Sequence, residues 1–553
     1  MNNTLLTLLS SELMRQYYAA GFWRDDTIYA LVAAHARRAP EKYAVRDCLR
    51  RVSYRALLAA ADRLGADLAG RGIRSGQRVS VWLPSRIECA VALLACSRNG
   101  YVCCPSLHRD HTVGDIIALL KRTRSAALIA QSGYGADADR RDLFAALGDA
   151  GSLRHVYRLD PLTNDQGLFA QAGGAVAEPS KQDANRIVYL AFTSGTTGEP
   201  KGVMHSDNTL LANARAMASD WGITDDSVIY SLSPLSHNLG FGAMVMALAA
   251  GGELIVHDLP KGASLVDRVV ETGTSFMVGV PTHATDLLHE MRHRGLNRLG
   301  RLEGFRISGA AASSEVVAGL LDHGVVPQSG YGMTETCSHQ YTLPADEPKL
   351  IIETSGRACP GYEIRIWRAD DPDVEAAVGE IGQIGGRGAS LMLGYFDDQA
   401  ATEDAFNAHG WFMTGDLGWV DQNGYLRITG RKKDVIIRGG HNIYPARIEA
   451  LAMRHEAVER AAAIPVRDPR LGEKVCLAVV FRAGRRLEAA ELLAHLDAAG
   501  LSRYDMPEYV LELAHIPLTP SGKMKKRDIV EWIEQGRLTP APVRRQAERR
   551  ASR

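Results

Sequence analysis

The chain lacks an excess of charge of either sign. Its 553 residues include 64 Lys and Arg against 64 Asp and Glu, so the formal net charge is zero at pH 7. A protein without a net field has no general electrostatic attraction for nucleic acid or anionic lipid. We therefore expect small molecules, and no nucleic acid, as its partners.

The cysteines lack the spacing of a metal site or of a redox pair. Eight are present, and none of them forms a CxxC pair or a zinc-ligand pattern. This arrangement favours reduced thiols, and hence a cytoplasmic protein, and we assign the cysteines no chemistry.

Long apolar runs are also missing. The N-terminal stretch MNNTLLTLLSSELMRQYY has no basic segment ahead of its short apolar piece, and the longest later run covers residues 241–250. A membrane-spanning helix needs about 20 apolar residues. We expect no membrane span and no targeting segment.

The length and the alternation of elements predict the fold. A chain of 553 residues is too long for a single core. Amphipathic helices such as 54–68 alternate with strands such as 78–83 and 188–192, which predicts an α/β fold of layered sheets. Gly-rich segments after about residue 353 predict a small β-barrel. We expect a large body at 1–430, a small α+β portion at 431–536 and a disordered Arg-rich tail at 537–553.

The strand at 188–192 leads into TSGTTGEPKG at residues 193–202. Its hydroxyls, its glycines and the charge of Lys201 suit a polyphosphate. A Walker loop would have Gly-Lys-Ser/Thr here, whereas the chain has Pro200-Lys201-Gly202. A carboxylate for Mg²⁺ must therefore come from elsewhere. The alternative is a Gly/Thr-rich loop without a ligand.

The ten residues at 193–202 resemble the phosphate loop of the adenylate-forming superfamily, which includes acyl-CoA ligases, adenylation domains and luciferases. The amino-acid sequences of this loop and of RGGHN at 438–442 are most similar to those of bacterial acyl-CoA ligases for alicyclic, aromatic or medium-chain acids. The resemblance covers about residues 25–529. It implies ATP, Mg²⁺ and CoA as substrates and cofactors.

The resemblance implies an ATP site built from several motifs. The phosphate loop contributes Thr193, Ser194, Gly195, Thr196, Thr197, Gly198 and Lys201. YGMTE at 331–335 supplies the residues that this loop lacks: an adenine-stacking Tyr331 with Gly332, a catalytic Thr334 at the α-phosphate, and Glu335 for the metal. Taken alone, YGMTE is equally typical of a surface turn.

Further ATP contacts follow from resemblance only. Gly309, Ala310 and Ala311 match adenine contacts, although small residues at a strand end also simply permit close packing. Asp416 and Arg431 match ribose ligands. Either charge is also compatible with a solvated turn.

His237 and Asn238 lie where relatives bind the acid. As a lone histidine, His237 would more often be structural, but the resemblance places it, with a catalytic role, between the acid pocket and the thiol tunnel. Asn238 replaces the aspartate of amino-acid-activating relatives, so an ammonium group would stay unpaired. The small residues that follow leave volume for a compact apolar acid or permit tight helix packing. The acid-binding residues implied are His237, Asn238, Gly240, Gly309 and Gly332.

The last portion carries two more motifs. The turn Gly439-Gly440-His441 resembles the lining of the CoA tunnel, and Lys523 in PSGK resembles the catalytic lysine, whose charge also contacts ATP. A random exposed lysine is the alternative. Lys433 is the expected hinge.

We therefore expect an AMP-forming acid–CoA ligase. The body would bind ATP and the acid and form an acyl-adenylate, and the mobile last portion would rotate before CoA attacks. The enzyme alternatives are the loading of an aryl acid onto a carrier protein and, less favoured, a luciferase-like oxidation. A nucleotide-binding sensor is the alternative that is not an enzyme, and a homodimer is compatible with every one of these.

Overall fold

The computed structural model describes residues 8–148, 151–163, 169, 182–193, 200–309, 312–518 and 524–543. The chain divides into two compact units. Unit 1 consists of Met1–Ile364 and Gly386–Phe412, and unit 2 consists of Arg365–Gly385 and Met413–Arg553. Unit 2 therefore includes residues on both sides of position 431.

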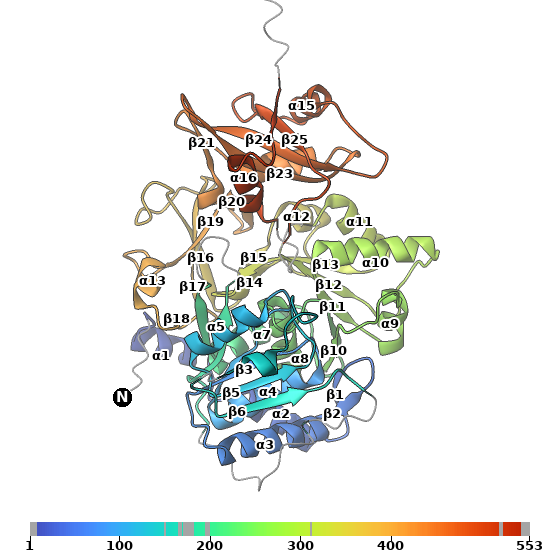
Figure 1. The fold of residues 1–553 in the computed structure, drawn as a ribbon, viewed down its shortest axis with the longest axis vertical. Coiled ribbons are helices and arrows are strands. Elements are labelled where there is room, and N and C mark those ends of the chain that lie inside the picture. The colour runs from blue at the N-terminus through green and yellow to red at the C-terminus, as the bar shows by residue number, and fades with distance from the viewer. Residues whose placement is uncertain are drawn as a thin grey trace, which may run out of the picture. The chain divides into compact units, whose positions relative to one another are not determined.

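Unit 1 contains a nine-stranded sheet (Figure 1). Its central strands, from β13 to β1, run parallel, and β2, β14 and β15 are antiparallel to their neighbours. Parallel strands end at one edge of a sheet, where α/β proteins bind their ligands. The order is β15 (Arg357–Ala358), β14 (Cys337–Tyr341), β13 (Val326–Met333), β12 (Gly304–Ser308), β11 (Phe276–Gly279), β9 (Val228–Ser231), β10 (Glu253–Val256), β1 (Tyr43–Arg46) and β2 (Arg51–Ser53).

The second sheet of unit 1 has seven strands. It is parallel from β7 to β6, and β8 and β18 add an antiparallel edge. The order is β18 (Gly394–Tyr395), β8 (Gly202–Ser206), β7 (Ile187–Phe192), β4 (Val102–Cys104), β3 (Arg78–Trp82), β5 (Ala127–Gln131) and β6 (His155–Leu159).

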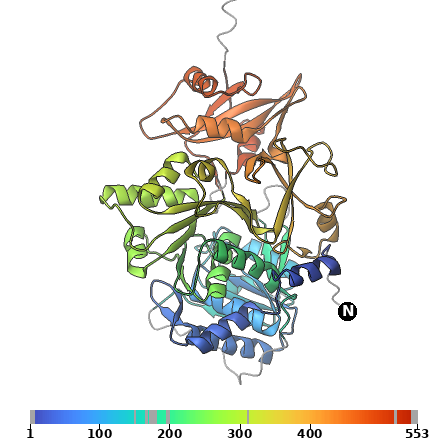
Figure 2. The same ribbon diagram turned by 180° about the vertical axis from the view of Figure 1, so that it is seen from behind.

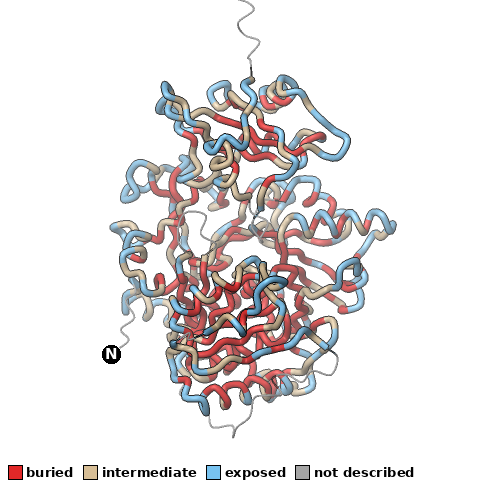
Figure 3. Tube along the Cα trace, viewed as in Figure 1, coloured by how far each residue is buried: buried red, intermediate tan, exposed pale blue. Residues whose placement is uncertain are grey.

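Helices and sheets alternate in layers, as the alternating sequence pattern predicts. One core lies between the two sheets and includes Val79 and Tyr189 from one sheet and Val256 and Val278 from the other. Neighbouring residues such as Leu190 and Ile255 point to the outer faces and belong to other cores, because side chains alternate along a strand. Figures 1 and 2 show these layers from opposite sides, and Figure 3 shows buried strands beneath exposed helix surfaces.

Each helical layer has its own set of helices. The layer between the sheets contains α2 (Ile28–Arg38), α3 (Tyr54–Gly70), α4 (Ile87–Asn99), α7 (Asp207–Asp220) and α8 (Asn238–Ala250). The outer face of the nine-stranded sheet packs on α9 (Leu265–Thr272), α10 (Pro281–His293), α11 (Ser314–Asp322) and α12 (Pro348–Glu353). The outer face of the other sheet packs on α5 (Val113–Thr123) and α6 (Leu143–Ala146). Among the described helices of unit 1, two lie outside these layers, α1 (Ser11–Ala19) and α13 (Gln399–Asp404).

Local sequence signals fix the ends of the helices around the candidate site. Ser206 caps α7 by accepting a hydrogen bond from Thr209 N at 3.2 Å, which ends β8 and starts the helix within one residue. α8 ends at Ala250 and is capped by Gly251, whose φ of 79° is the left-handed conformation that glycine adopts most easily. α8 is apolar all round, and it is accordingly buried over most of its length.

Unit 2 contains a six-stranded sheet. Val475, Leu477 and Val479 of β24 face a core with α14 and α15, and the intervening Cys476 and Ala478 face a second core with α16. The elements are β21 (Ile436–Arg438), β22 (His441–Ile443), β23 (Val458–Asp468), β24 (Gly472–Phe481), β25 (Tyr509–Glu512), β26 (Ala541–Pro542), α14 (Pro445–Ala452), α15 (Ala489–Ala498) and α16 (Lys526–Glu534).

The Gly-rich segments that predict a barrel form a four-stranded sheet. Its order is β16 (Tyr362–Trp367), β17 (Gly382–Gly388), β19 (Phe412–Val420) and β20 (Leu426–Arg431), and a short 3₁₀ turn η1 (Lys432–Asp434) follows.

The start of the predicted tail is ordered. β26 pairs with β25 through Ala541 and Val510, so the expectation of disorder from residue 537 is wrong for residues 537–543. Their backbone groups find partners at a sheet edge, which the Arg-rich composition did not indicate. The rest of the tail, 544–553, lies outside the described residues. Among the described helices, none is both long and apolar enough to cross a membrane.

Candidate nucleotide- and acid-binding site

The two ends of the predicted phosphate loop meet in a hairpin between β7 and β8. Thr193 N donates to Lys201 O at 3.0 Å, and Lys201 N donates to Thr193 Oγ1 at 3.2 Å. Ser194, Gly195, Thr196, Thr197 and Gly198 lie between these ends and outside the described residues. The structure therefore describes the neck of the loop, with Lys201 at its end.

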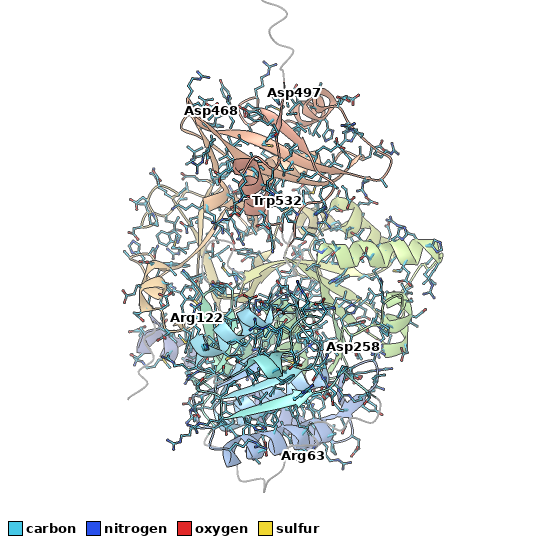
Figure 4. The ribbon with its side chains drawn as sticks, viewed as in Figure 1. Arg63, Arg122, Asp258, Asp468, Asp497 and Trp532 are labelled. Atoms are coloured by element: carbon cyan, nitrogen blue, oxygen red, sulfur yellow. The ribbon has the colours of Figure 1, made fainter. Side chains whose placement is uncertain are left out.

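Two side chains from other elements hold this neck. Arg122, which Figure 4 labels on α5, donates through Nη1 to Pro200 O at 2.6 Å. Ser106 Oγ accepts a hydrogen bond from Phe192 N at 2.5 Å. Gly202 is tightly packed, since a Cβ there would lie 3.1 Å from Phe396 Cβ. These contacts fix where the loop begins and ends.

Tyr395 joins Lys201 to Glu335. Lys201 Nζ lies 4.7 Å from the centroid of the Tyr395 ring, and Tyr395 OH donates to Glu335 Oε1 at 2.9 Å. β18 places Tyr395 opposite Val203 of β8, next to the neck of the loop. Burial, with the Glu335 carboxylate as a second cause, raises the pKa of Tyr395 well above its ordinary value. The phenol therefore stays protonated and can donate to the carboxylate.

The YGMTE motif is the end of β13 and the bend that follows it. Tyr331 pairs with Gln340 and Met333 with Cys337 across an antiparallel hairpin. A Cβ on Gly332 would lie 2.0 Å from Cys337 O, so only glycine fits there. Glu335 O accepts from Met392 N at 2.7 Å, which brings the motif to the segment that precedes Tyr395.

His205 of β8 holds the backbone of Thr334 by a hydrogen bond. Its Nε2 lies 2.7 Å from Thr334 O, and because a carbonyl oxygen only accepts, this nitrogen carries the proton. Burial lowers the pKa of His205 to about 4, so the ring is neutral. β8 thus supports both the phosphate loop and the threonine of YGMTE.

Gly309 follows β12 at the same sheet edge, with a φ of 91°. A Cβ there would lie 3.6 Å from Val280 Cγ1, which is ordinary contact, so its left-handed backbone accounts for the glycine. Ala310 and Ala311 lie outside the described residues.

His237, Asn238 and Gly240 lie at the N-terminal end of α8. Asn238 Nδ2 donates to Met333 O at 3.4 Å, which brings this end of the helix to β13. A Cβ on Gly240 would lie 2.3 Å from Pro234 O, so tight packing of the preceding loop accounts for this glycine. Gly242 differs, because it is exposed and nothing lies within 4 Å of an added Cβ. The open space beside α8 is therefore at Gly242.

His237 stacks on His108. The ring centroids are 4.0 Å apart and the planes differ by 7°. His108 Nδ1 lies 3.1 Å from Ser236 Oγ, and its carbonyl accepts from Trp82 Nε1 at 3.0 Å. Burial, together with the neighbouring histidines, lowers the pKa of His108 to about 2. A neutral ring thus fixes one face of His237.

In unit 2, Asp416 and Arg431 are neighbours. They pair across β19 and β20, and Arg431 Nε lies 3.3 Å from Asp416 Oδ1. Lys433 follows in η1, and burial lowers its pKa, with Arg431 as a second cause. The two predicted ribose ligands therefore form one carboxylate–guanidinium pair beside the predicted hinge.

Gly439 and Gly440 form the two-residue turn between β21 and β22. Their φ values are 57° and 86°, which two-residue hairpin turns of this kind require. His441 follows, with Nε2 at 2.9 Å from Asp505 Oδ1. Lys523 lies outside the described residues.

Sequence reasoning missed Tyr395, His108 and His205. Their contacts to Glu335, His237 and Thr334 come from elements far apart along the chain. Short motifs carry no signal for such contacts. Among the described residues, no three His, Cys, Asp or Glu side chains form a metal-binding group.

The fold and the candidate site indicate a class of protein: an α/β protein with a predicted phosphate loop between β7 and β8, a lysine and a carboxylate at the neck of this loop, and a second compact unit that contains the C-terminal residues. The AMP-binding enzyme family matches residues 32–396, and the AMP-binding enzyme C-terminal domain matches residues 447–523. The chain belongs to the AMP-binding enzyme family, and the predicted superfamily is confirmed.

Curated relatives extend over almost the whole chain. The medium-chain fatty-acid–CoA ligase of Escherichia coli is 28% identical over 97% of this chain and 96% of its own length. The salicyl-AMP ligase / salicyl-S-ArCP synthetase of Mycobacterium tuberculosis is 32% identical over 94% of this chain and 92% of its own length. The prediction of an AMP-forming ligase is confirmed at this level.

A solved structure agrees with this assignment. ATP-bound MatB from Rhodopseudomonas palustris has a TM-score of 0.81 and 28% identity, and the match covers 92% of this chain and 99% of that chain. The predicted fold, a large α/β body with a small C-terminal portion, is confirmed.

Proposed function

We propose that the protein is an ATP-dependent carboxylic acid–CoA ligase. In the first step a carboxylate oxygen bonds to the α-phosphorus of ATP, and pyrophosphate leaves with the electrons of the broken P–O bond. In the second step the CoA sulfur bonds to the acyl carbon, AMP leaves, and the thiol proton passes to water or to His237. The observation that carries the proposal is the contact series from Lys201 through Tyr395 to Glu335 at the neck of the phosphate loop.

The residues of unit 1 divide the work of the first step. The phosphate loop and Lys201 would bind the phosphates, Thr334 would contact the α-phosphate, and Tyr331 would stack on adenine. These roles need hydrogen-bond donors and a cation near the polyphosphate. Arg122 holds the backbone of the loop at Pro200, His205 holds the backbone of Thr334, and Tyr395 holds the side chain of Glu335. Fixed donors stabilise developing charge without reorganisation.

Glu335 is the residue that would hold Mg²⁺. A carboxylate suits this ion, which takes few protein ligands when it also binds substrate phosphates. When bound, Mg²⁺ supplies positive charge that offsets the charge of the phosphates. Tyr395 orients the Glu335 carboxylate by donating to Oε1.

Unit 2 would serve both steps. Asp416 and Arg431 would bind the ribose, Lys523 would stabilise the first transition state, and the Gly439-Gly440 turn with His441 would line the CoA path. We place the hinge at Lys433, the ATP- and acid-binding part at 1–430 and the mobile part at 431–536.

The acid is proposed to be compact, with an aromatic, alicyclic or medium-chain body. His237, Asn238, Gly240, Gly309 and Gly332 would surround it, and the open space at Gly242 supports a pocket beside α8. The relatives include ligases named for medium-chain fatty acids and for 2-hydroxy-7-methoxy-5-methyl-1-naphthoate.

Loading of a carrier protein is the second candidate function. It is favoured by the 32% identity to a relative named salicyl-AMP ligase / salicyl-S-ArCP synthetase. We further propose a cytoplasmic enzyme that acts without nucleic acid, and sedimentation would show whether it is a homodimer.

The test is pyrophosphate exchange over a panel of acids, followed by an acceptor assay with the best acid. We expect acyl-CoA with free CoA at millimolar concentration. Acylation of a phosphopantetheinylated carrier protein without acyl-CoA would favour the second candidate, and ATP binding without exchange for any acid would contradict both.

A further inference from the structure

Arg306 is a buried arginine whose guanidinium is largely unused. It lies on β12 with 1% exposure, and its Nη1 donates to Gln328 Oε1 on the neighbouring β13. Its Nε and Nη2 are buried and have no hydrogen-bond partner. The guanidinium has five N–H donors in a fixed fork, so most of its capacity is unmet.

The charge of Arg306 is also unmatched. Burial lowers the pKa of Arg306 to about 10, so the group remains charged at neutral pH. Its guanidinium carbon lies 5.7 Å from the centroid of the Tyr341 ring, and the Tyr341 phenol donates to Asp220 at 2.8 Å. No carboxylate forms an ion pair with Arg306 in the part of the chain that the structure describes. A buried charge without a partner destabilises the folded protein, because the interactions with water that it loses are not replaced.

Other buried side chains near Arg306 also have unpaired polar atoms. Gln328 Nε2 is buried without a partner, and so are both ring nitrogens of His339. Burial, with Arg306 as a further cause, lowers the pKa of His339 to about 3, so its ring is neutral. A neutral histidine and an amide complement an anion.

Arg306 lies on β12, a few residues before the strand end at which the candidate acid site is located. It is two residues before Ser308 on the same face of β12, and Ser308 Oγ donates to Gly330 O at 3.1 Å. The guanidinium occupies the space beside Gly330, where a Cβ would lie 2.7 Å from Arg306 Nη2. Gly309, which directly follows β12, and Gly332, two residues after Gly330 within β13, are residues that we propose to contact the acid.

This face of the sheet packs against the layer of helices between the two sheets. Tyr341, beside Arg306, belongs to the core between the sheets together with Phe241 and Ala243 of α8. α8 begins at Asn238, which bonds to Met333 O. The proposed pocket between α8 and β13 and the buried guanidinium therefore lie on the same side of the sheet.

We propose that Arg306 binds a second carboxylate at the far end of the acid, so that the substrate is a dicarboxylic acid with a compact body. This inference rests on the proposed ligase function and narrows its substrate class. Arg306 is about three residues from the strand ends, so the two carboxylates would be about 7–10 Å apart. Benzene-1,4-dicarboxylate and heptanedioate are probes of suitable length.

The test compares each diacid with its monoacid partner, 4-methylbenzoate or heptanoate, in pyrophosphate exchange. For the wild type we expect kcat/KM to favour the diacid by about 10- to 100-fold, the size expected for charged hydrogen bonds. Arg306→Met should lose or reverse this preference, and Arg306→Lys should retain part of it. Arg292→Met, at an exposed arginine of α10, is the matched control and should keep the preference.

Thermal denaturation keeps the proposal testable apart from catalysis. The diacid should raise the melting temperature of the wild type and not that of Arg306→Met, whereas ATP should raise both. Without ligand, Arg306→Met should melt no lower than the wild type, because it loses an unmatched buried charge. A lower melting temperature would make Arg306 a structural residue and overturn the proposal.

The remaining outcomes separate this proposal from the ligase function. If Arg306→Met exchanges pyrophosphate with monoacids and its ratio of kcat/KM for diacid to monoacid equals that of the wild type, the ligase function stands and the proposed role of Arg306 is wrong. Absence of exchange with every acid contradicts the ligase function, and the diacid-dependent melting shift then decides on Arg306 alone.

Discussion

Tyr395 OH donates a hydrogen bond to Glu335 Oε1 at 2.9 Å, while Lys201 lies over the ring of the same tyrosine at 4.7 Å. One side chain thus holds the carboxylate and the cation of the candidate phosphate site at fixed places. We therefore propose that Tyr395 is a positioning residue, which would act on ATP through Glu335 and Lys201.

Tyr395→Phe removes the hydrogen bond and keeps the ring. We expect pyrophosphate exchange to fall by about 10- to 100-fold, the range of a hydrogen bond to a charged group. We also expect a higher Mg²⁺ requirement, which a merely structural role would not change. Tyr43→Phe, at an exposed tyrosine of β1, is the control. An unchanged Mg²⁺ dependence in Tyr395→Phe would show that Glu335 is oriented by other contacts.

Glu335→Gln removes the charge and keeps the oxygen that accepts from Tyr395. We expect the Mg²⁺ concentration for half-maximal exchange to rise by at least about tenfold. Circular dichroism should show an intact fold, and Glu459→Gln, at an exposed glutamate, should behave as the wild type. Wild-type metal dependence in Glu335→Gln would assign the ion to another residue.

The sequence predicts the elements around this site better than it predicts their contacts. The strand expected at 188–192 is part of β7, and the two ends of the predicted phosphate loop, Thr193 and Lys201, meet between β7 and β8. The contact between Tyr395 and Glu335 depends on the pairing of β18 with β8, strands separated by almost two hundred residues. No local periodicity encodes such a pairing.

The glycines show the same limit. The small residues of α8 indicate either a pocket or tight packing, and the sequence leaves both open. The structure separates them, because the carbonyl of Pro234 excludes a side chain at Gly240 whereas open space lies beside Gly242. Such a distinction depends on a backbone that arrives from outside the helix.

His205 makes stability depend on pH. Burial lowers its pKa to about 4 from 6.5, so between these values the unfolded chain binds a proton that the folded protein does not. The free energy of unfolding therefore decreases as the pH falls through this window, by up to about 1.4 kcal/mol per unit. His205→Gln keeps a donor for Thr334 O and does not titrate.

We expect His205→Gln to have a lower melting temperature than the wild type at pH 8, and we expect this gap in melting temperature to be smaller at pH 5. Thermal denaturation at both values measures this gap. His289→Gln, at an exposed histidine of α10, should show a constant difference. A gap for His205→Gln that is the same at both pH values would mean that His205 does not control this pH dependence.

Lys523→Ala tests the predicted division of labour between the two steps. We expect acyl-adenylate formation to fall by about 100- to 1000-fold, as for the loss of one transition-state charge contact. Conversion of supplied acyl-adenylate to the thioester should persist, because the lysine belongs to the portion that we propose moves away before thioester formation. Equal losses in both steps would contradict this role.

Gly440→Leu tests the CoA path in unit 2. Gly440 has a φ of 86°, and nothing lies within 4 Å of an added Cβ, so a leucine would project into open space from a strained turn. If this space is the thiol path, the variant should keep pyrophosphate exchange and lose thioester formation.

Strain at this turn is a second possible cause of such a loss, so a matched control is needed. Gly484 has a φ of 73° in the same unit and equally open surroundings, and Gly484→Leu carries a comparable backbone strain. Loss of thioester formation in both variants would assign the effect to strain, whereas loss in Gly440→Leu alone would place the thiol path at the Gly439-Gly440 turn.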